Sequence, residues 1–254
     1  MKRTYALLSI AVMLMACKSE TKKEETKPEA TQETAAAEEN EWIYLFDGST
    51  TEGWRSYNGE ALPPQWVIED DVLTFDTEKR TEANKKGGND IIYAAEEFDN
   101  FELAWEWKIP EGGNSGMLYH IKEGDWGMPE TSPEYQMLDD LKWEEINNAK
   151  LEEWQKTGAD YAMYVPDVSQ KITKPAGEWN HMKLTVNGAS VKVVLNGKQV
   201  VVADLDQWTT GRKNPDGSRN KFRTALKDMP RTGSIGLQYH GHPVWFKNIV
   251  VKPL

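Results

Sequence analysis

The nine residues Phe101-Glu102-Leu103-Ala104-Trp105-Glu106-Trp107-Lys108-Ile109 decide the fold class of this 254-residue chain. Every second residue of the stretch is apolar, and the residues between them are charged or alanine. Because successive side chains of a strand point to opposite faces of its sheet, a period of two predicts a strand with one buried face. The buried face takes the aromatic side chains, so this strand belongs at the centre of a β-rich core.

Short segments with strand character recur along the rest of the chain, separated by turn signals. Asn196-Gly197 lies between two valine-rich runs and predicts a type I′ hairpin turn, because both residues accept positive φ angles. The further predicted strands are residues 65–68, 72–75, 90–94, 116–121, 134–138, 181–186, 234–240 and 244–251. Many short strands joined by turns favour an all-β antiparallel sandwich.

One segment departs from this pattern. Residues 141–156 are rich in Glu, Lys, Asn and Trp, and Ile146, Lys150, Leu151 and Trp154 fall at helical spacings. We expect a short helix there, within a long insertion. An insertion of this length in a compact domain often shapes a binding site.

The first 17 residues have the order of a lipoprotein signal peptide. They begin with the basic pair Lys2-Arg3, continue with an apolar run and end in a small-residue cleavage site, Leu14-Met15-Ala16, before Cys17. The apolar run is shorter than the roughly 20 residues needed to cross a bilayer. Cys17 is the only cysteine, so we expect it to carry the lipid. Residues 18–40 have the composition of a flexible tether, followed by one domain over residues 41–254. The expected location is the bacterial envelope, lipid-anchored at the outer membrane and facing the periplasm or the cell surface.

Charge and motifs exclude several classes of function. The formal net charge is −11, which makes nucleic acid an unfavourable partner. A glycine-rich phosphate loop, a Cys-x-x-Cys pair, a His-Glu-x-x-His helix and a Gly-x-Ser-x-Gly elbow are all missing from the sequence. Nucleotide binding, structural zinc and serine-esterase chemistry therefore lack their usual signatures.

Three of the predicted strands pair an apolar face with a polar face. By alternation, His120, Glu134, Gln136, Gln238 and His240 project away from the core. Each of them alone has an ordinary reading as a surface residue of a half-buried strand. Together they form a short, hydrogen-bonding and largely uncharged set, which is what the hydroxyl groups of a sugar require.

Five motifs, taken in order, resemble the 3-keto-disaccharide hydrolase family, and the resemblance spans residues 41–254. They are Leu45-Phe46-Asp47-Gly48 with Gly53-Trp54, Gly113-Asn114-Ser115-Gly116, Pro133-Glu134-Tyr135-Gln136-Met137-Leu138-Asp139-Asp140, Gly177-Glu178-Trp179-Asn180, and Gly236-Leu237-Gln238-Tyr239-His240-Gly241 followed by Val244-Trp245-Phe246-Lys247-Asn248-Ile249. The resemblance implies a concanavalin A-like jelly-roll sandwich of two antiparallel sheets, with the site on the concave sheet and activity on 3-keto glycosides. Two departures from the family pattern are Asp71, where the family tends to have Gly, and the insertion after Asp140.

The chemistry implied by the resemblance needs three groups. A ketone at C3 of the sugar acidifies the proton at C2, so a base can remove this proton and the group on C1 can leave by elimination, after which water adds. The site then needs a base, a stabiliser of the enolate oxygen and an acid for the leaving group. His120, Glu134 and His240 are the titratable residues expected on the shared face and are the predicted catalytic residues, without individual roles. A divalent cation held by His and carboxylate is a further candidate for stabilising the enolate.

Four more residues are predicted to bind the substrate by hydrogen bonds: Asn114, Gln136, Asp139 and Gln238. For each of them the alternative is that the side chain only forms hydrogen bonds within a turn or loop of the protein. By strict alternation Asp139 lies opposite Glu134, so it joins the site only if the strand ends or bulges before it.

Two other functions stay open. A classical glycoside hydrolase would need two carboxyl groups about 5 to 10 Å apart, and alternation places only Glu134 well, with Glu106 as an outside candidate. A glycan-binding surface lipoprotein would bind an unmodified sugar without turnover.

Overall fold

The computed structural model describes residues 41–79 and 89–254, all of which belong to one compact unit, Glu39–Leu254. The predicted signal peptide, Cys17 and the tether at 18–40 lie outside the described residues. Within the described part of the chain, no helix is long and apolar enough to cross a membrane.

An eight-stranded antiparallel sheet forms one layer of this unit. Its strands run in the order β11-β10-β9-β6-β13-β4-β3, and β1 also pairs with β13. The bounds are β1 Ile43–Phe46, β3 Trp66–Glu69, β4 Val72–Phe75, β6 Phe101–Lys108, β9 Asn180–Asn187, β10 Ser190–Leu195, β11 Lys198–Asp204 and β13 Trp245–Pro253. Asn196 and Gly197 have φ angles of 47° and 82°, as predicted for the tight turn between β10 and β11.

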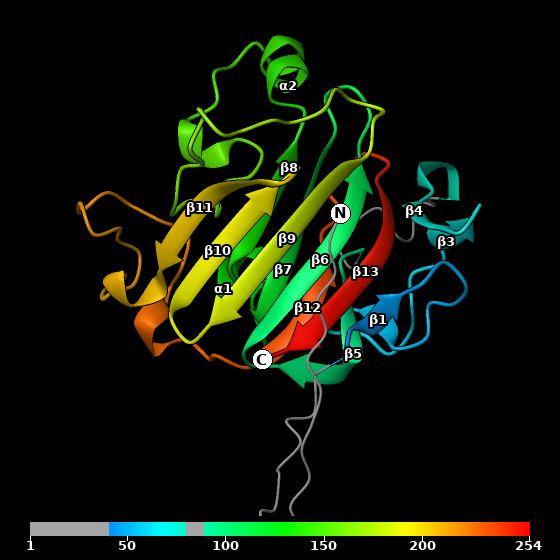
Figure 1. The fold of residues 1–254 in the computed structure, drawn as a ribbon, viewed down its shortest axis with the longest axis horizontal. Coiled ribbons are helices and arrows are strands. Elements are labelled where there is room, and N and C mark those ends of the chain that lie inside the picture. The colour runs from blue at the N-terminus through cyan, green and yellow to red at the C-terminus, as the bar shows by residue number, and fades with distance from the viewer. Residues whose placement is uncertain (1–40, 80–88) are drawn as a thin grey trace, which may run out of the picture. The chain divides into compact units, whose positions relative to one another are not determined.

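A five-stranded antiparallel sheet forms the second layer, in the order β2-β5-β12-β7-β8. The bounds are β2 Trp54–Ser56, β5 Ile91–Phe98, β7 Asn114–Ile121, β8 Glu134–Leu138 and β12 Gly233–Leu237. In Figure 1 the larger sheet faces the viewer, and β7 and β12 lie behind it. The predicted fold class, an all-β jelly-roll sandwich of two antiparallel sheets, is confirmed.

The core lies between the two sheets and follows the alternation of β6. Trp105 and Trp107 are 0% and 1% exposed, whereas Glu106 between them is only partly buried. Tyr119 and Tyr135 of the smaller sheet close the same core from the other side, with their rings stacked at 5.9 Å. Each large side chain buried in this way contributes about 1.5 to 3 kcal/mol.

Helices are few and short. The described elements are α1 Met128–Thr131 and α2 Asp140–Asn147, with 3-10 turns at Thr77–Lys79, Glu153–Gln155, Leu205–Gln207 and Leu226–Asp228. The helix predicted within residues 141–156 is α2, but it ends at Asn147, because the next residue, Asn148, has a left-handed φ of 47° that stops the helix. Figure 1 shows α2 beyond the end of β8, at one end of the sandwich.

Candidate active site

A polar cavity of about 370 Å³ lies on the face of the five-stranded sheet that points away from the core. Strand β7 contributes Asn114, β8 contributes Glu134 and Gln136, and the segment after β12 contributes Gln238 and His240. The structure therefore brings five of the seven predicted catalytic and substrate-binding residues together. Among them Glu134, Gln136, Gln238 and Asn114 are 3% to 8% exposed, so this face is covered rather than open to solvent.

The alternation of β8 explains how this face is built. Tyr135 and Met137 enter the core, which turns Glu134 and Gln136 outward. Gly116 on the neighbouring strand makes room for the carboxyl group, because a Cβ atom there would lie 2.6 Å from Oε1 of Glu134. Any larger residue at position 116 would displace the Glu134 carboxyl group.

Lys221 pairs with Glu134 in the cavity. Its ammonium nitrogen lies 2.8 Å from Oε2 of Glu134, and the two side chains are 17% and 4% exposed. The same ammonium lies 4.7 Å from the ring centre of Tyr161. A cation fixed by a carboxylate and an aromatic face in a covered cavity can stabilise negative charge that develops on a bound substrate.

Asp90 is the second carboxyl group of the cavity. Its pKa is raised to about 6, mainly by burial and also by the Glu134 carboxyl group, although the backbone N–H of Tyr239 and the charge of His240 act to lower it. That N–H donates to Oδ1 of Asp90 at 2.8 Å, which fixes the orientation of the carboxyl group. A carboxyl group with this pKa can accept and release a proton near neutral pH.

Two amide oxygens in the cavity have no hydrogen-bond partner among the described residues: Oδ1 of Asn114 and Oε1 of Gln136. The side-chain N–H of Gln136 donates to the backbone carbonyl of Gln155 at 3.1 Å. This bond fixes the amide group of Gln136, so that its nitrogen and not its oxygen faces Gln155. Buried acceptors that lack a donor cost about 1 to 3 kcal/mol each. Hydroxyl groups of a ligand would supply the missing donors.

His120 does not join this cavity, so its predicted position on the shared face is wrong. Its φ of 53° forms part of an irregularity between β7 and β12, where the pairing register shifts between Ser234 and Gly236. Past this bulge, Ile121 takes the outward position and packs with Leu118. The His120 ring instead lies 5.7 Å from the Phe101 ring, and its Nε2 bonds the carbonyl of Asp99 at 2.8 Å. Burial lowers the pKa of His120, as expected for a neutral structural histidine.

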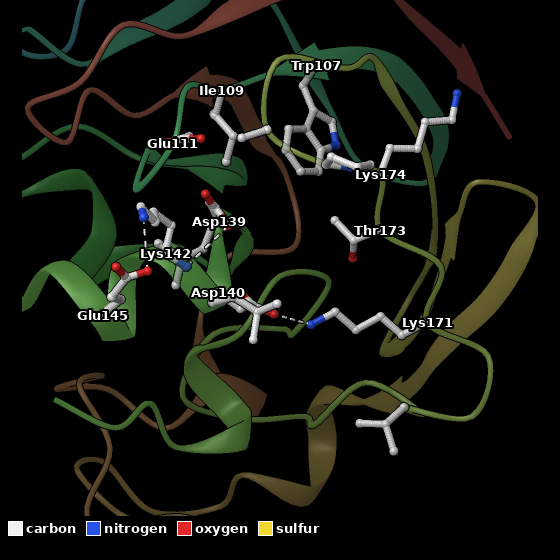
Figure 2. Close-up of a pocket in the computed structure, with 15 residues that line it drawn as sticks. Trp107, Ile109, Glu111, Asp139, Asp140, Lys142, Glu145, Lys171, Thr173 and Lys174 are labelled. Carbon is white, nitrogen blue, oxygen red and sulfur yellow. Dashed lines mark hydrogen bonds and ion pairs between the residues drawn. The ribbon is translucent and has the colours of Figure 1, made fainter. Parts of the chain in front are cut away.

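Asp139 also lies outside the polar cavity, against the substrate-binding role predicted for it. It is the N-cap of α2, where Oδ1 accepts from the N–H of Lys142 and Oδ2 accepts from the N–H of Gly112. Strand β8 ends at Leu138, but alternation still carries Asp139 away from Glu134. Its side chain lines a different cavity, shown in Figure 2.

The remaining acidic candidate, Glu106, is on the other sheet. Its carboxyl group accepts from the side-chain amide of Asn248 at 2.7 Å and pairs with Lys247 at 3.3 Å. The partner carboxyl group that a two-carboxylate mechanism would need beside Glu134 is thus Asp90, not Glu106.

Asp90, Tyr161 and Lys221 are three cavity residues that the sequence did not predict, and Pro129 and Tyr239 also line the cavity without having been predicted. Asp90 directly precedes the apolar run Ile91-Ile92. A single acidic residue at the start of a strand is usually a solvent-exposed surface residue, so the sequence offers no reason to place it in a site. Tyr161 and Lys221 come from irregular segments without periodicity. Only the fold brings them to β8.

A metal site is not evident within the described residues, where no group of three or more His, Cys, Asp or Glu side chains is arranged to hold an ion. The predicted divalent cation stays a prediction.

Comparison with known proteins adds to this geometry. A curated relative, the 3-keto-disaccharide hydrolase of Bacteroides thetaiotaomicron, is 36% identical over 236 residues, which cover 84% of this chain and 78% of the relative. Two crystal structures of Parabacteroides distasonis ATCC 8503 proteins, each described as a "putative glycosyl hydrolase", are also similar. One has a TM-score of 0.70 and 34% identity over 84% of this chain and 94% of its own. The other has a TM-score of 0.68 and 32% identity over 85% and 100%.

The family model for the 3-keto-alpha-glucoside-1,2-lyase-like domain matches residues 41–252, which is nearly the whole of the folded unit. These residues include all five outward-facing side chains of the polar cavity. The chain belongs to the 3-keto-alpha-glucoside-1,2-lyase-like domain family.

Proposed function

We propose that this protein cleaves 3-keto glycosides in the polar cavity, by removal of the C2 proton, elimination of the group on C1 and addition of water. Family membership supports the substrate class, and the name of the Bacteroides relative supports cleavage of a 3-keto disaccharide. The observation that carries the proposal is Asp90: a carboxyl group with a pKa of about 6, placed in one cavity with the Glu134–Lys221 pair and His240.

Asp90 is the proposed base. At neutral pH a carboxyl group with a pKa near 6 is largely ionised, yet it is a stronger base than an ordinary carboxylate. Glu134 is less available for this role because its carboxyl group is ion-paired with Lys221. Its part is to hold the ammonium in place.

Lys221 is the proposed stabiliser of the enolate. When the C2–H bond breaks, its electron pair forms the C2=C3 double bond and negative charge develops on the C3 oxygen. A preorganised cation in a covered cavity stabilises such charge strongly.

His240 is the proposed acid for the leaving group. The C1–O bond breaks as the enolate collapses to an unsaturated ketone, and the departing oxygen takes a proton from the imidazole. Water then adds at C1 and a proton returns to C2, which gives the free 3-keto sugar. Asn114, Gln136 and Gln238 orient the ring through its hydroxyl groups, and the unpartnered oxygens of the first two support this role.

Incubation with a 3-keto disaccharide and with its unoxidised parent tests the proposal. We expect the wild-type protein to release both halves of the oxidised sugar and to leave the parent intact, and Asp90→Asn to slow the release by a factor of about 10² to 10⁴. A parallel incubation with a chelator tests whether a divalent cation takes part. Failure to cleave the 3-keto disaccharide would refute the proposal.

A classical glycoside hydrolase is the second candidate, since Asp90 and Glu134 place two carboxyl groups in one cavity. The carboxyl group with the raised pKa would be the acid and the other the nucleophile or base. Cleavage of the unoxidised parent at a comparable rate would select this mechanism. Saturable binding of the parent without turnover of either sugar would select a glycan-binding lipoprotein.

A further inference from the structure

A second cavity, of about 590 Å³, opens at the α2 end of the sandwich. Its floor is Trp107, Ile109 and Leu138, at the ends of the core strands, and its walls are α2 and the segment 168–176. Of the residues that line it, none lines the polar cavity. The volume lies within the usual range of small-molecule sites, about 300 to 1,000 Å³.

Two polar atoms at this cavity are buried and have no hydrogen-bond partner within the described ranges: Nε1 of Trp107 and Oγ1 of Thr173. Trp107 is 1% exposed. In Figure 2 its indole nitrogen is on the side of the cavity that carries Thr173 and Lys174. A buried N–H with nothing to donate to is unfavourable, so a donor so placed at a cavity wall indicates a ligand with an acceptor.

The charges around the cavity largely neutralise one another. Lys171 pairs with Asp140, and Lys142 pairs with Glu145 at 2.9 Å, both visible in Figure 2. The carboxyl group of Asp139 accepts hydrogen bonds from the backbone N–H groups of Lys142 in α2 and of Gly112. Glu111 and Lys174 also line the cavity, so its four carboxyl groups exceed its three ammonium groups by one, and no excess cation is present to select a phosphate.

A lining with little net charge, an apolar floor and unpartnered hydrogen-bonding atoms together define the chemistry of the ligand. A sugar unit has C–H faces for the floor, oxygen acceptors for the indole N–H, and hydroxyl groups that can both donate to and accept from Thr173. We propose that this cavity is a second, non-catalytic site that binds a neutral saccharide. The insertion that follows Asp140 builds one wall of it, so the segment that departs from the family pattern has a binding role.

Nuclear magnetic resonance of the mature chain labelled with ¹⁵N-tryptophan tests this proposal. The indole signal of Trp107 is identified by its loss in Trp107→Phe. We expect maltose or cellobiose to shift this signal saturably, in the wild type and equally in Asp90→Asn, because the polar cavity is not involved. Thr173→Val should raise the Kd by a factor of about five to ten, as expected for the loss of one hydrogen bond.

The matched control is Thr209→Val, since Thr209 is exposed and lines neither cavity; its Kd should equal that of the wild type. Glucuronate and inorganic phosphate should bind more weakly than the neutral disaccharides. An unshifted Trp107 signal at 50 mM of both disaccharides would overturn the proposal. So would an unchanged Kd in Thr173→Val, or tighter binding of either anion.

Discussion

The ammonium nitrogen of Lys221 lies 2.8 Å from Oε2 of Glu134, although the two residues are 87 positions apart in the chain. Glu134 belongs to β8, and Lys221 belongs to an irregular segment that covers the face of the sheet. The pair therefore ties this covering segment to the strand that carries the polar residues. It links the stability of the fold to the chemistry of the cavity.

A double-mutant cycle measures this link. Lys221→Met leaves the Glu134 carboxylate buried without its cation, so it should cost roughly 3 kcal/mol of unfolding free energy. Glu134→Gln in the same chain should recover much of that loss, while turnover stays low in all three variants. Urea unfolding gives the coupling energy.

The pair Lys122–Glu97 is a suitable control, because its side chains are 42% and 49% exposed with the nitrogen and oxygen 2.5 Å apart. Its coupling energy should be about 0.5 kcal/mol. Equal coupling energies for the two pairs would contradict the buried character of Lys221–Glu134.

Asp90 sets a pH dependence for turnover. As the proposed base it must be ionised, so kcat/KM should rise with pH up to about 6 and then level off. Asp90→Asn keeps an oxygen for the Tyr239 N–H but cannot accept a proton, and turnover should fall by a factor of about 10² to 10⁴. A pH profile from 4.5 to 8.5 checks both, and an Asp90→Asn enzyme with wild-type kcat would rule out the assignment.

Asp90 should also make the folded state less stable at higher pH. Its pKa is raised on folding from 3.8 to about 6, so the folded state binds the proton more tightly than the unfolded state does. This contribution is fully present below about pH 4 and is lost as the pH rises through 6. Asp90→Asn should therefore gain stability relative to the wild type between pH 4 and 7, by on the order of 1 to 3 kcal/mol. A constant difference across this range would show that the carboxyl group titrates normally.

The two histidines predicted as catalytic should behave in opposite ways. His120→Ala removes the bond to the Asp99 carbonyl and the contact with Phe101, so it should cost about 1 to 3 kcal/mol of stability with little effect on kcat. His240 is exposed at the rim of the polar cavity, and His240→Ala should lower kcat strongly with little change in melting temperature. The reverse pattern would return His120 to the site.

The lipid anchor at Cys17 is tested by fractionation. We expect the wild-type protein in the membrane fraction and Cys17→Ala in the soluble fraction or mislocalised. If Cys17→Ala stays with the membrane to the same extent, the anchor is not at this residue.

Alternation in the sequence predicted the strands well where one face meets the core. Strand β6 alternates over its full length, and its inward residues are the Trp and Phe side chains of the core. Strands β1 and β2 were missed because β1, Ile43-Tyr44-Leu45-Phe46, shows no alternation of apolar and polar residues and β2 spans only three residues.

The same rule failed at His120 because it assumes an uninterrupted strand. One residue with positive φ shifted the register and exchanged the faces of His120 and Ile121. For Asp139 the rule held, but the requirement for an N-cap on α2 decided what the side chain does.

Asp90 and Lys221 could not be predicted at all from local pattern. The position of Asp90 depends on the pairing of β5 with β12, and that of Lys221 depends on a covering segment without regular structure. Long-range pairing of this kind is decided by the packed fold rather than by neighbouring residues.

Cleavage of a 3-keto disaccharide in D₂O tests the central claim most directly. Removal of the C2 proton followed by its return from solvent predicts a released 3-keto sugar with one deuterium at C2, detected by mass spectrometry and proton resonance. The same 3-keto sugar kept in the buffer without enzyme controls for spontaneous exchange. A product that retains its C2 proton, or cleavage of the unoxidised parent at an equal rate, would contradict the account.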